Sequence, residues 1–299
     1  MLGPTGESGS LSGVIDQIKQ AEALGINNVW MANIFSFDAI STLGLAARET
    51  TTIELGTAVT PTYPRHPTAL AQQALTTAAA SEDRFVLGIG LSHKIVIEGM
   101  LGLSYEKPAK HMREYLSVLM PLVRGEPCNF QGEQYRVMGL QMDVPGSSNM
   151  PVVVAALGPK MLQVAGELAD GTNTWMVGPK TLDQHIIPKL SGGASSVGRP
   201  NPMVVGGFPI LLTHKPEVAR EKIAKQLVMY GQLPSYRAML DMEGASGPAD
   251  IAIVGDENYL GSEIRRLESI GVTHFNGAIS GADQSEYDRT LAFLAELAD

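Results

Sequence analysis

Short apolar segments alternate with amphipathic segments along almost the whole of this chain, and this order constrains the fold more than any single motif does. The apolar segments predict buried strands at residues 26–31, 52–59, 84–90, 151–157, 172–177, 203–212 and 272–279. Because these runs are almost continuously apolar, they are typical of parallel strands covered on both faces. Helical patterns lie between them, for example from Met112 to Val123 and from Leu260 to Ile270.

Glycine residues mark several of the predicted helix ends. Gly25, Gly171 and Gly271 each follow an amphipathic segment and precede an apolar run. We expect each of them to cap a helix in the left-handed conformation. One segment departs from the alternation, since about residues 128–145 predict an inserted β-hairpin.

The strand–helix order predicts an α/β protein with one domain, residues 1–299, folded as a (β/α)8 TIM barrel with insertions. An open doubly wound sheet is the alternative that seven strands allow. An eighth strand would have to come from the N-terminus, where Met1 and Leu2 precede a turn-like segment at residues 3–6. We therefore expect a truncated first strand; a flexible tail is the simpler interpretation.

Charge and composition exclude several classes of protein. The chain has 22 basic and 31 acidic side chains, and the net charge of −9 argues against a nucleic-acid surface. No apolar run approaches the roughly 18–20 residues of a membrane span, and no signal sequence opens the chain. The single cysteine, Cys128, cannot form an internal disulfide, which fits a reducing compartment. We expect a cytoplasmic enzyme without nucleic-acid or membrane partners.

The predicted strand ends carry small residues and few acids. In a barrel these ends form the active site, yet they offer no carboxylate pair for glycoside hydrolysis and no His, Asp or Glu cluster with metal-ligand spacing. The sequence also lacks a nucleophile elbow and a phosphate-binding loop of the Walker type. Such residues are suited to surrounding a flat cofactor that carries the reaction itself.

The segment from Leu157 to Lys160 is the best local candidate for holding a phosphate. Gly158 precedes Pro159, which is favoured at the first position of a helix. Free N–H groups at that helix start, with Lys160 or Lys180 nearby, suit an anion. An ordinary strand–turn–helix connection explains the same residues equally well.

Several longer segments, taken in order, resemble one family across nearly the whole chain. They are EALGINNVW, LGTAVTPTYPRHPTALAQQALT, RFVLGIGLSHK, MREYLSVLMPLVRGEP with FQGEQY, PVVVAALGPKMLQVAGELADG and YGQLPSYRAMLDMEG. Their succession resembles the luciferase-like flavin and deazaflavin oxidoreductases, specifically the actinobacterial and methanogen branch that uses coenzyme F-420 (8-hydroxy-5-deazaflavin). The resemblance implies a TIM barrel, a homodimer and a small-molecule substrate.

The resemblance also implies which residues contact the cofactor. A non-prolyl cis peptide that backs the ring system matches Ala58-Val59, and the phosphate grip matches the segment from Ala155 to Pro159. The complete set of implied or inferred cofactor-binding residues is Asn33, Ala58, Val59, Gly88, Gly90, Ser92, Ala155, Ala156, Gly158, Pro159, Lys160 and Lys180. Lys160, Lys180 and Arg199 are expected to form a local positive patch there.

Two departures from the family pattern limit the reaction. Sugar-phosphate dehydrogenases of this family have Asp-His after strand two and Glu after strand four, where this chain has Asn33-Ile34 and His93. The resemblance therefore implies hydride transfer from the reduced cofactor to an electron-poor C=C, C=N or C=O bond, with His93, Tyr63 or water as proton donor. An FMN-dependent monooxygenase and a non-catalytic flavin-binding protein are the alternatives, and no metal is expected.

Overall fold

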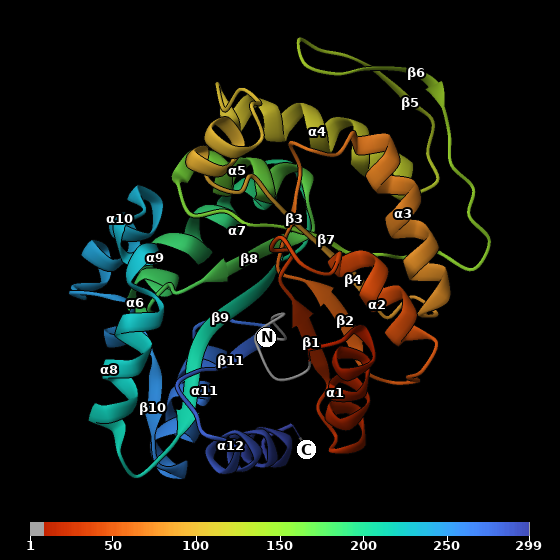
Figure 1. Cartoon of the computed structure of the whole chain (residues 1–299). Coiled ribbons are helices and arrows are strands. Elements are labelled where there is room, and N and C mark those ends of the chain that lie inside the picture. Colours follow the sequence, from red (N-terminus) through yellow and green to blue (C-terminus); the bar gives the residue numbers. More distant parts are fainter. Residues whose placement is uncertain (1–8, 299) are drawn as a thin grey trace.

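Parallel strands form the wall of a nearly closed barrel in the computed structural model, which describes residues 9–298 (Figure 1). The strands of the wall are β1 (Asn28–Met31), β2 (Glu54–Thr57), β3 (Thr60–Pro61), β4 (Phe85–Gly90), β7 (Val152–Val154), β8 (Gly171–Trp175), β9 (Met203–Leu212), β10 (Ile253–Gly255) and β11 (His274–Ile279). Each described pairing between them is parallel, in the order β1-β2-β4-β7-β8-β9, with β10 and β11 both paired to β9 and β3 paired to β4. The predicted barrel is confirmed.

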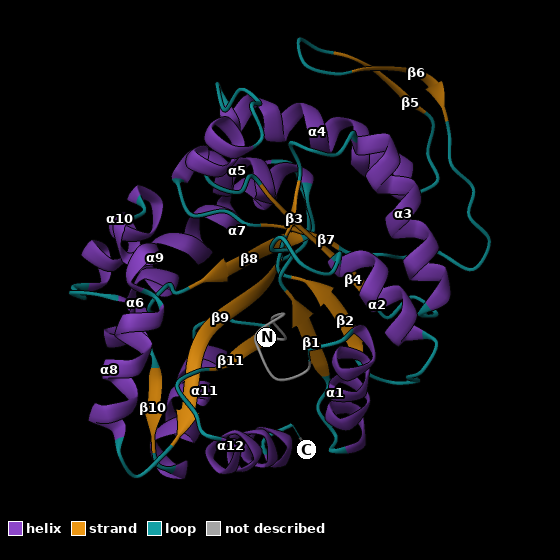
Figure 2. Cartoon of the chain, in the orientation of Figure 1, coloured by secondary structure: helices purple, strands orange, loops and turns teal. Residues whose placement is uncertain are grey.

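Helices surround this wall (Figure 2). They are α1 (Leu11–Ala23), α2 (Ala39–Ala47), α3 (Pro67–Ala80), α4 (Pro108–Val123), α5 (Pro159–Leu168), α6 (Pro179–Thr181), α7 (Ile187–Ser196), α8 (Pro216–Gln226), α9 (Val228–Gln232), α10 (Pro234–Glu243), α11 (Glu257–Ser269) and α12 (Gln284–Glu296). Shorter helical turns are η1 (Ile95–Met100), η2 (Leu182–Ile186) and η3 (Pro248–Ile251). No helix among the described residues is long and apolar enough to cross a membrane.

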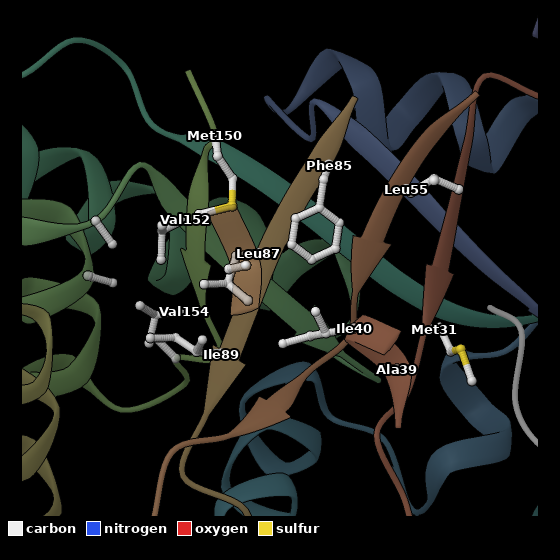
Figure 3. Close-up of a cluster of buried hydrophobic side chains, with 14 of the residues drawn as sticks. Met31, Ala39, Ile40, Leu55, Phe85, Leu87, Ile89, Met150, Val152 and Val154 are labelled. Atoms are coloured by element: carbon white, nitrogen blue, oxygen red, sulfur yellow. The ribbon is translucent and has the colours of Figure 1, made fainter. Parts of the chain in front are cut away.

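Side chains that point outward from the strands pack against the helices. Phe85, Leu87 and Ile89 of β4 meet Ile40 of α2 and Val152 of β7 in this outer layer (Figure 3). The alternate residues point into the barrel, where Trp30, Val86, Val153 and Val205 form a second buried cluster. Alternation therefore does operate along these strands, but both of their faces are apolar.

Local sequence explains several helix boundaries. Ser10 and Asp38 accept a backbone N–H at the starts of α1 and α2. Gly25 and Gly271 follow helices with φ of +88° and +104°, as predicted. The prediction for Gly171 is wrong, because this residue opens β8 without a positive φ, and a Cβ there would fall on the carbonyl oxygen of Met203. Glycine is required at Gly171 by close strand packing and not by a left-handed cap.

Several strands are shorter than their apolar runs. The predicted strand at residues 52–59 is interrupted at Ala58-Val59, and the predicted strand at residues 172–177 ends at Trp175 because Met176 has a φ of +53°. The sequence did not predict β10, which has only three residues. Strands β5 (Cys128–Gln131) and β6 (Arg136–Leu140) pair antiparallel within the predicted hairpin segment and extend away from the barrel (Figure 1).

The wall is incomplete between β1 and β11. The two strands approach each other, but no pairing joins them within residues 9–298. A cavity of about 420 Å³ lies there, lined by β1, β11, α1, α11 and α12. The truncated first strand was predicted at Met1–Pro4, which lies outside the described residues. This cavity is at the side of the barrel, and its lining contains none of the predicted site residues.

Candidate functional site

The peptide bond between Ala58 and Val59 is cis, as the resemblance implied. It lies between β2 and β3, at the carboxyl end of the strand pair, next to the end of β4. A Cβ at Gly88 would fall on the carbonyl oxygen of Thr57, and one at Gly90 would lie 2.5 Å from Cγ2 of Val59. The two glycines therefore make room for the segment around Ala58 and Val59. Their contact with a cofactor stays a prediction.

The chain turns sharply where β4 and β8 end. Ser92 has a φ of +59° and Met176 a φ of +53°, both in the left-handed region that non-glycine residues seldom adopt. The hydroxyl of Tyr105 donates to the carbonyl oxygen of Ser92 at 3.2 Å. This contact holds the loop after β4 against the segment that leads into α4.

His93 follows Ser92 and lies half-buried among aromatic side chains. Its ring centroid is 6.4 Å from that of Tyr230 and 5.9 Å from that of Tyr236, which come from α9 and α10. Burial lowers the pKa of His93 below its ordinary value of 6.5. The ring is therefore mostly neutral at pH 7, which makes His93 a poor source of a proton.

Tyr63 lies just beyond β3 in a second aromatic cluster. Its ring is stacked on His111, with centroids 4.0 Å apart and an interplanar angle of 7°, and on Tyr105 at 5.3 Å. Its hydroxyl is buried and has no hydrogen-bond partner among the described residues. Burial raises the pKa of Tyr63, so the hydroxyl stays protonated across the neutral range. The ring is therefore fixed, and its hydroxyl is a donor that a ligand could use only by displacing the groups that cover it.

Asn33 lies in the loop after β1, and part of its side chain is already engaged. Its Oδ1 accepts the backbone N–H of Ala39 at 3.0 Å and so fixes the start of α2. The amide group of Asn33 remains a predicted cofactor contact, but its position is set by the protein.

The start of α5 is open. Gly158 is its N-cap residue, no side chain caps the helix, and a Cβ at Gly158 would meet no atom within 4 Å. Pro159 and Lys160 are exposed, whereas Ala156 is buried. The N–H groups at this helix start are therefore accessible at the carboxyl end of β7, which is the geometry that binds an anion.

Comparison with known proteins places this arrangement in a family. A family model described as luciferase-like monooxygenase matches residues 2–274. The chain belongs to the luciferase-like monooxygenase family. It is 30% identical over 213 residues to a 5,10-methylenetetrahydromethanopterin reductase of Methanolobus tindarius, covering 71% of this chain and 64% of that protein. It is 32% identical over 167 residues to a putative coenzyme F-420-dependent oxidoreductase of Mycobacterium tuberculosis, covering 52% of this chain and 48% of that protein. The chain thus spans less than two thirds of the length of these relatives.

Solved structures with low sequence identity share the fold of this luciferase-like chain. The coenzyme F-420-dependent tetrahydromethanopterin reductase of Methanopyrus kandleri superposes with a TM-score of 0.82 at 22% identity, over 99% of this chain and 96% of that one. A type II Baeyer–Villiger monooxygenase of Pseudomonas putida in complex with FMN gives a TM-score of 0.76 at 15% identity, over 99% of this chain and 94% of that one.

The luciferase-like chain places the predicted basic residues in three different settings. Lys160 is exposed at the open start of α5. The backbone N–H of Lys180 instead donates to Oε1 of Glu243 at 3.1 Å, so a carboxylate already occupies the start of α6. The prediction for Arg199 is wrong, because its guanidinium is 2.7 Å from Asp170, a residue that precedes β8 at the opposite end of the barrel.

Sequence reasoning missed the aromatic residues that the luciferase-like fold brings to the strand ends. Tyr105, Tyr230 and Tyr236 lie in the two clusters. The segment YGQLPSYRAML contains two of them, but nothing in it indicated contact with His93 after β4. Within residues 9–298, no group of three or more His, Cys, Asp or Glu side chains is placed to hold a metal ion.

Proposed function

We propose that this luciferase-like protein is a coenzyme F-420-dependent oxidoreductase that transfers a hydride between the reduced deazaflavin and an electron-poor C=C, C=N or C=O bond of a small organic substrate. The observation that carries the proposal is the open start of α5, which adjoins the strand ends beside the segment at Ala58 and Val59. Two similar proteins are named for the same cofactor, the putative coenzyme F-420-dependent oxidoreductase of Mycobacterium tuberculosis and the coenzyme F-420-dependent tetrahydromethanopterin reductase of Methanopyrus kandleri, and this supports the proposal.

The residues present fit this cofactor. Its phosphate requires N–H donors and a cation, and the start of α5 offers both at Gly158 and Lys160. Its flat ring requires an apolar surface without projecting side chains, which Ala58, Val59 and Ala155 provide. When bound, the deazaflavin supplies a two-electron hydride carrier, and the protein contributes binding and orientation.

Tyr63 and His93 are the polar side chains best placed to face a substrate. Tyr63 has a protonated, unpartnered hydroxyl, and His93 is half-buried beside Tyr230 and Tyr236. Because burial favours the neutral imidazole of His93, we assign hydrogen-bond donation to Tyr63 and contact with the body of the substrate to His93.

A cofactor titration tests the proposal. The purified full chain is mixed with oxidised coenzyme F-420 or with FMN, and quenching of the cofactor's fluorescence gives each Kd. We expect submicromolar binding of the deazaflavin and binding of FMN at least tenfold weaker. Submicromolar FMN binding without deazaflavin binding would identify the alternative, an FMN-dependent monooxygenase.

A turnover assay distinguishes the proposed oxidoreductase from a non-catalytic flavin-binding protein. Reduced coenzyme F-420 is supplied with a panel of an enone, a cyclic imine, a methylene-tetrahydropterin and a ketone, and cofactor oxidation is followed by absorbance. We expect oxidation with at least one electron-poor double bond. Tight cofactor binding without oxidation by any member of the panel would favour the non-catalytic flavin-binding protein.

We also propose a cytoplasmic homodimer. The support is the family resemblance for the dimer and the single cysteine for the compartment. Light scattering on the purified chain, whose protomer mass is 31.8 kDa, tests the oligomeric state.

A further inference from the structure

The inserted hairpin is connected to Tyr63 by a chain of direct contacts. Gln134 lies in the turn between β5 and β6, and its Oε1 is 2.9 Å from Nδ1 of His111 on α4. The ring of His111 in turn stacks on that of Tyr63. The hairpin turn therefore contacts the loop after β3 by way of His111.

Both nitrogens of His111 are held. With the amide oxygen of Gln134 at Nδ1, this nitrogen carries the proton, and Nε2 accepts from the hydroxyl of Thr62 at 3.0 Å. His111 is only 2% exposed, and burial lowers its pKa, so the neutral ring is favoured. One tautomer and one ring orientation satisfy all of these contacts.

The hairpin turn is itself fixed to α4. The carboxylate of Glu114, one helical turn after His111, accepts the backbone N–H groups of Glu133, Gln134 and Tyr135 at 3.1, 2.8 and 3.3 Å. Gly132 is needed beside this carboxylate, because a Cβ there would collide with it. Gln134 is thus placed by backbone contacts and not by its own flexible side chain alone.

We propose that Tyr63 donates a hydrogen bond to the substrate atom that becomes electron-rich as the double bond accepts a hydride, and that His111 and Gln134 are positioning residues that hold the Tyr63 ring for this contact. The inference rests on the proposed function. A buried hydroxyl without a partner is costly in a folded protein, and a ligand atom that displaces the groups covering the Tyr63 hydroxyl would supply the missing acceptor. Gln134 acts only through His111 and Tyr63.

A double-mutant cycle tests the chain of contacts. The variants are Tyr63→Phe, Gln134→Ala and their combination, measured for kcat and KM with reduced coenzyme F-420 and cyclohex-2-enone, and for Kd of the oxidised cofactor. Tyr115→Phe is the matched control for the hydroxyl, since Tyr115 also has a buried unpartnered hydroxyl but lies within α4. Gln141→Ala is the control for the glutamine, since it follows β6 and donates to Gly125.

We expect Tyr63→Phe to lower kcat/KM about 100-fold, the effect of removing one donor to a developing anion. Gln134→Ala should lower it about tenfold in the parent chain and less than twofold when Tyr63 is already Phe. Both controls should stay within twofold, and the Kd of the cofactor should stay within twofold throughout. An equal loss from Gln134→Ala in both backgrounds, or equal effects of Tyr63→Phe and Tyr115→Phe, would overturn the proposal.

A measurement without turnover separates this inference from the proposed function. The ¹⁵N spectrum of histidine-labelled protein should show His111 as a single Nδ1–H tautomer, and Gln134→Ala should convert it to a mixture while Gln141→Ala should not. A tautomer unchanged by Gln134→Ala would overturn the positioning role even in an active enzyme. Failure of the parent chain to oxidise the cofactor with any substrate would instead count against the proposed function.

Discussion

Nε2 of His274 on β11 lies 3.4 Å from Oε1 of Glu54 on β2, inside the barrel near the amino ends of the strands. The distance is that of an ion pair, yet both neutral forms are favoured. Burial raises the pKa of Glu54 to about 7 and lowers the pKa of His274. Oε1 of Glu54 has no hydrogen-bond partner among the described residues.

Because the pKa of Glu54 is raised, we expect the stability of the folded protein to fall as the pH rises. Since its pKa in the folded state is above the ordinary value of 4.5, its contribution is complete below pH 4.5 and is lost as the pH passes about 7. The shift corresponds to about 3 kcal/mol in the free energy of unfolding. Urea unfolding should show Glu54→Gln to be more stable than the parent by this amount at pH 8, with a much smaller difference at pH 4.5.

Comparing the parent chain with Glu54→Gln separates the contribution of Glu54 to stability from that of His274. The lowered pKa of His274 acts in the opposite direction. It stabilises the folded protein fully at a pH above 6.5, the ordinary pKa of histidine, and this stabilisation is lost as the pH falls through the lowered pKa. That contribution is largely common to the parent and Glu54→Gln, so it cancels in their difference. A difference that is the same at pH 4.5 and pH 8 would contradict the prediction.

We expect the loss of stability caused by Gly90→Ala to be partly reversed by Val59→Ala. Gly90→Ala puts a methyl group 2.5 Å from Cγ2 of Val59 and 3.1 Å from Cβ of Ala155. We expect a loss of about 1–3 kcal/mol from overpacking. Val59→Ala removes the nearer of the two groups and should recover about half of this loss, as measured by the denaturant midpoint of the double variant. A double variant less stable than either single variant would show that Val59 is not what excludes the methyl group.

Lys160 and Lys180 form a matched pair for the cofactor phosphate. Lys160→Glu should raise the Kd of oxidised coenzyme F-420 about tenfold, or about 1.4 kcal/mol, because it places a negative charge at the open start of α5. Lys180→Glu should change it less than threefold, since Glu243 already occupies the start of α6. The difference should shrink at high salt. Equal changes in the two variants would place the phosphate elsewhere.

We expect the turn of the hairpin to be held in place chiefly by the carboxylate of Glu114. Burial acts to raise the pKa of Glu114, but the backbone N–H groups of residues 133–135 outweigh it and hold the pKa below its ordinary value. Glu114→Ala should cost about 1–3 kcal/mol, because three partly buried backbone N–H groups lose their acceptor. Hydrogen exchange should show faster exchange at Glu133, Gln134 and Tyr135 and little change in the barrel strands. Unchanged exchange at these three amides would contradict the assignment.

The βα alternation predicted the barrel because its signal is local. Residues 203–212 are continuously apolar, and β9 has those bounds, since a central parallel strand buries both faces. The start of α3 is likewise set locally, since Pro67 takes its first position and Nδ1 of His66 accepts the N–H of Thr68. Short or peripheral elements lack such a signal, which is why β10 was missed.

The candidate site could be predicted only in part. The cis bond at Ala58-Val59 and the helix start at Gly158 followed from contiguous residues and from the family resemblance. Arg199 was placed at the wrong end of the barrel, because its partner Asp170 is distant in the sequence. Charge alone does not show which end of a strand a long side chain reaches.

The sequence by itself determined the repeating order of elements, the strand and helix types and the helix ends at Gly25 and Gly271, because hydrophobic periodicity and capping act between near neighbours. Only the tertiary structure decided that Gln134, His111 and Tyr63 touch in succession, that Glu243 occupies the start of α6, and that Glu54 and His274 face each other. These contacts join residues up to 220 positions apart, and they form only when the strands assemble into the barrel and the hairpin and α10 pack against it.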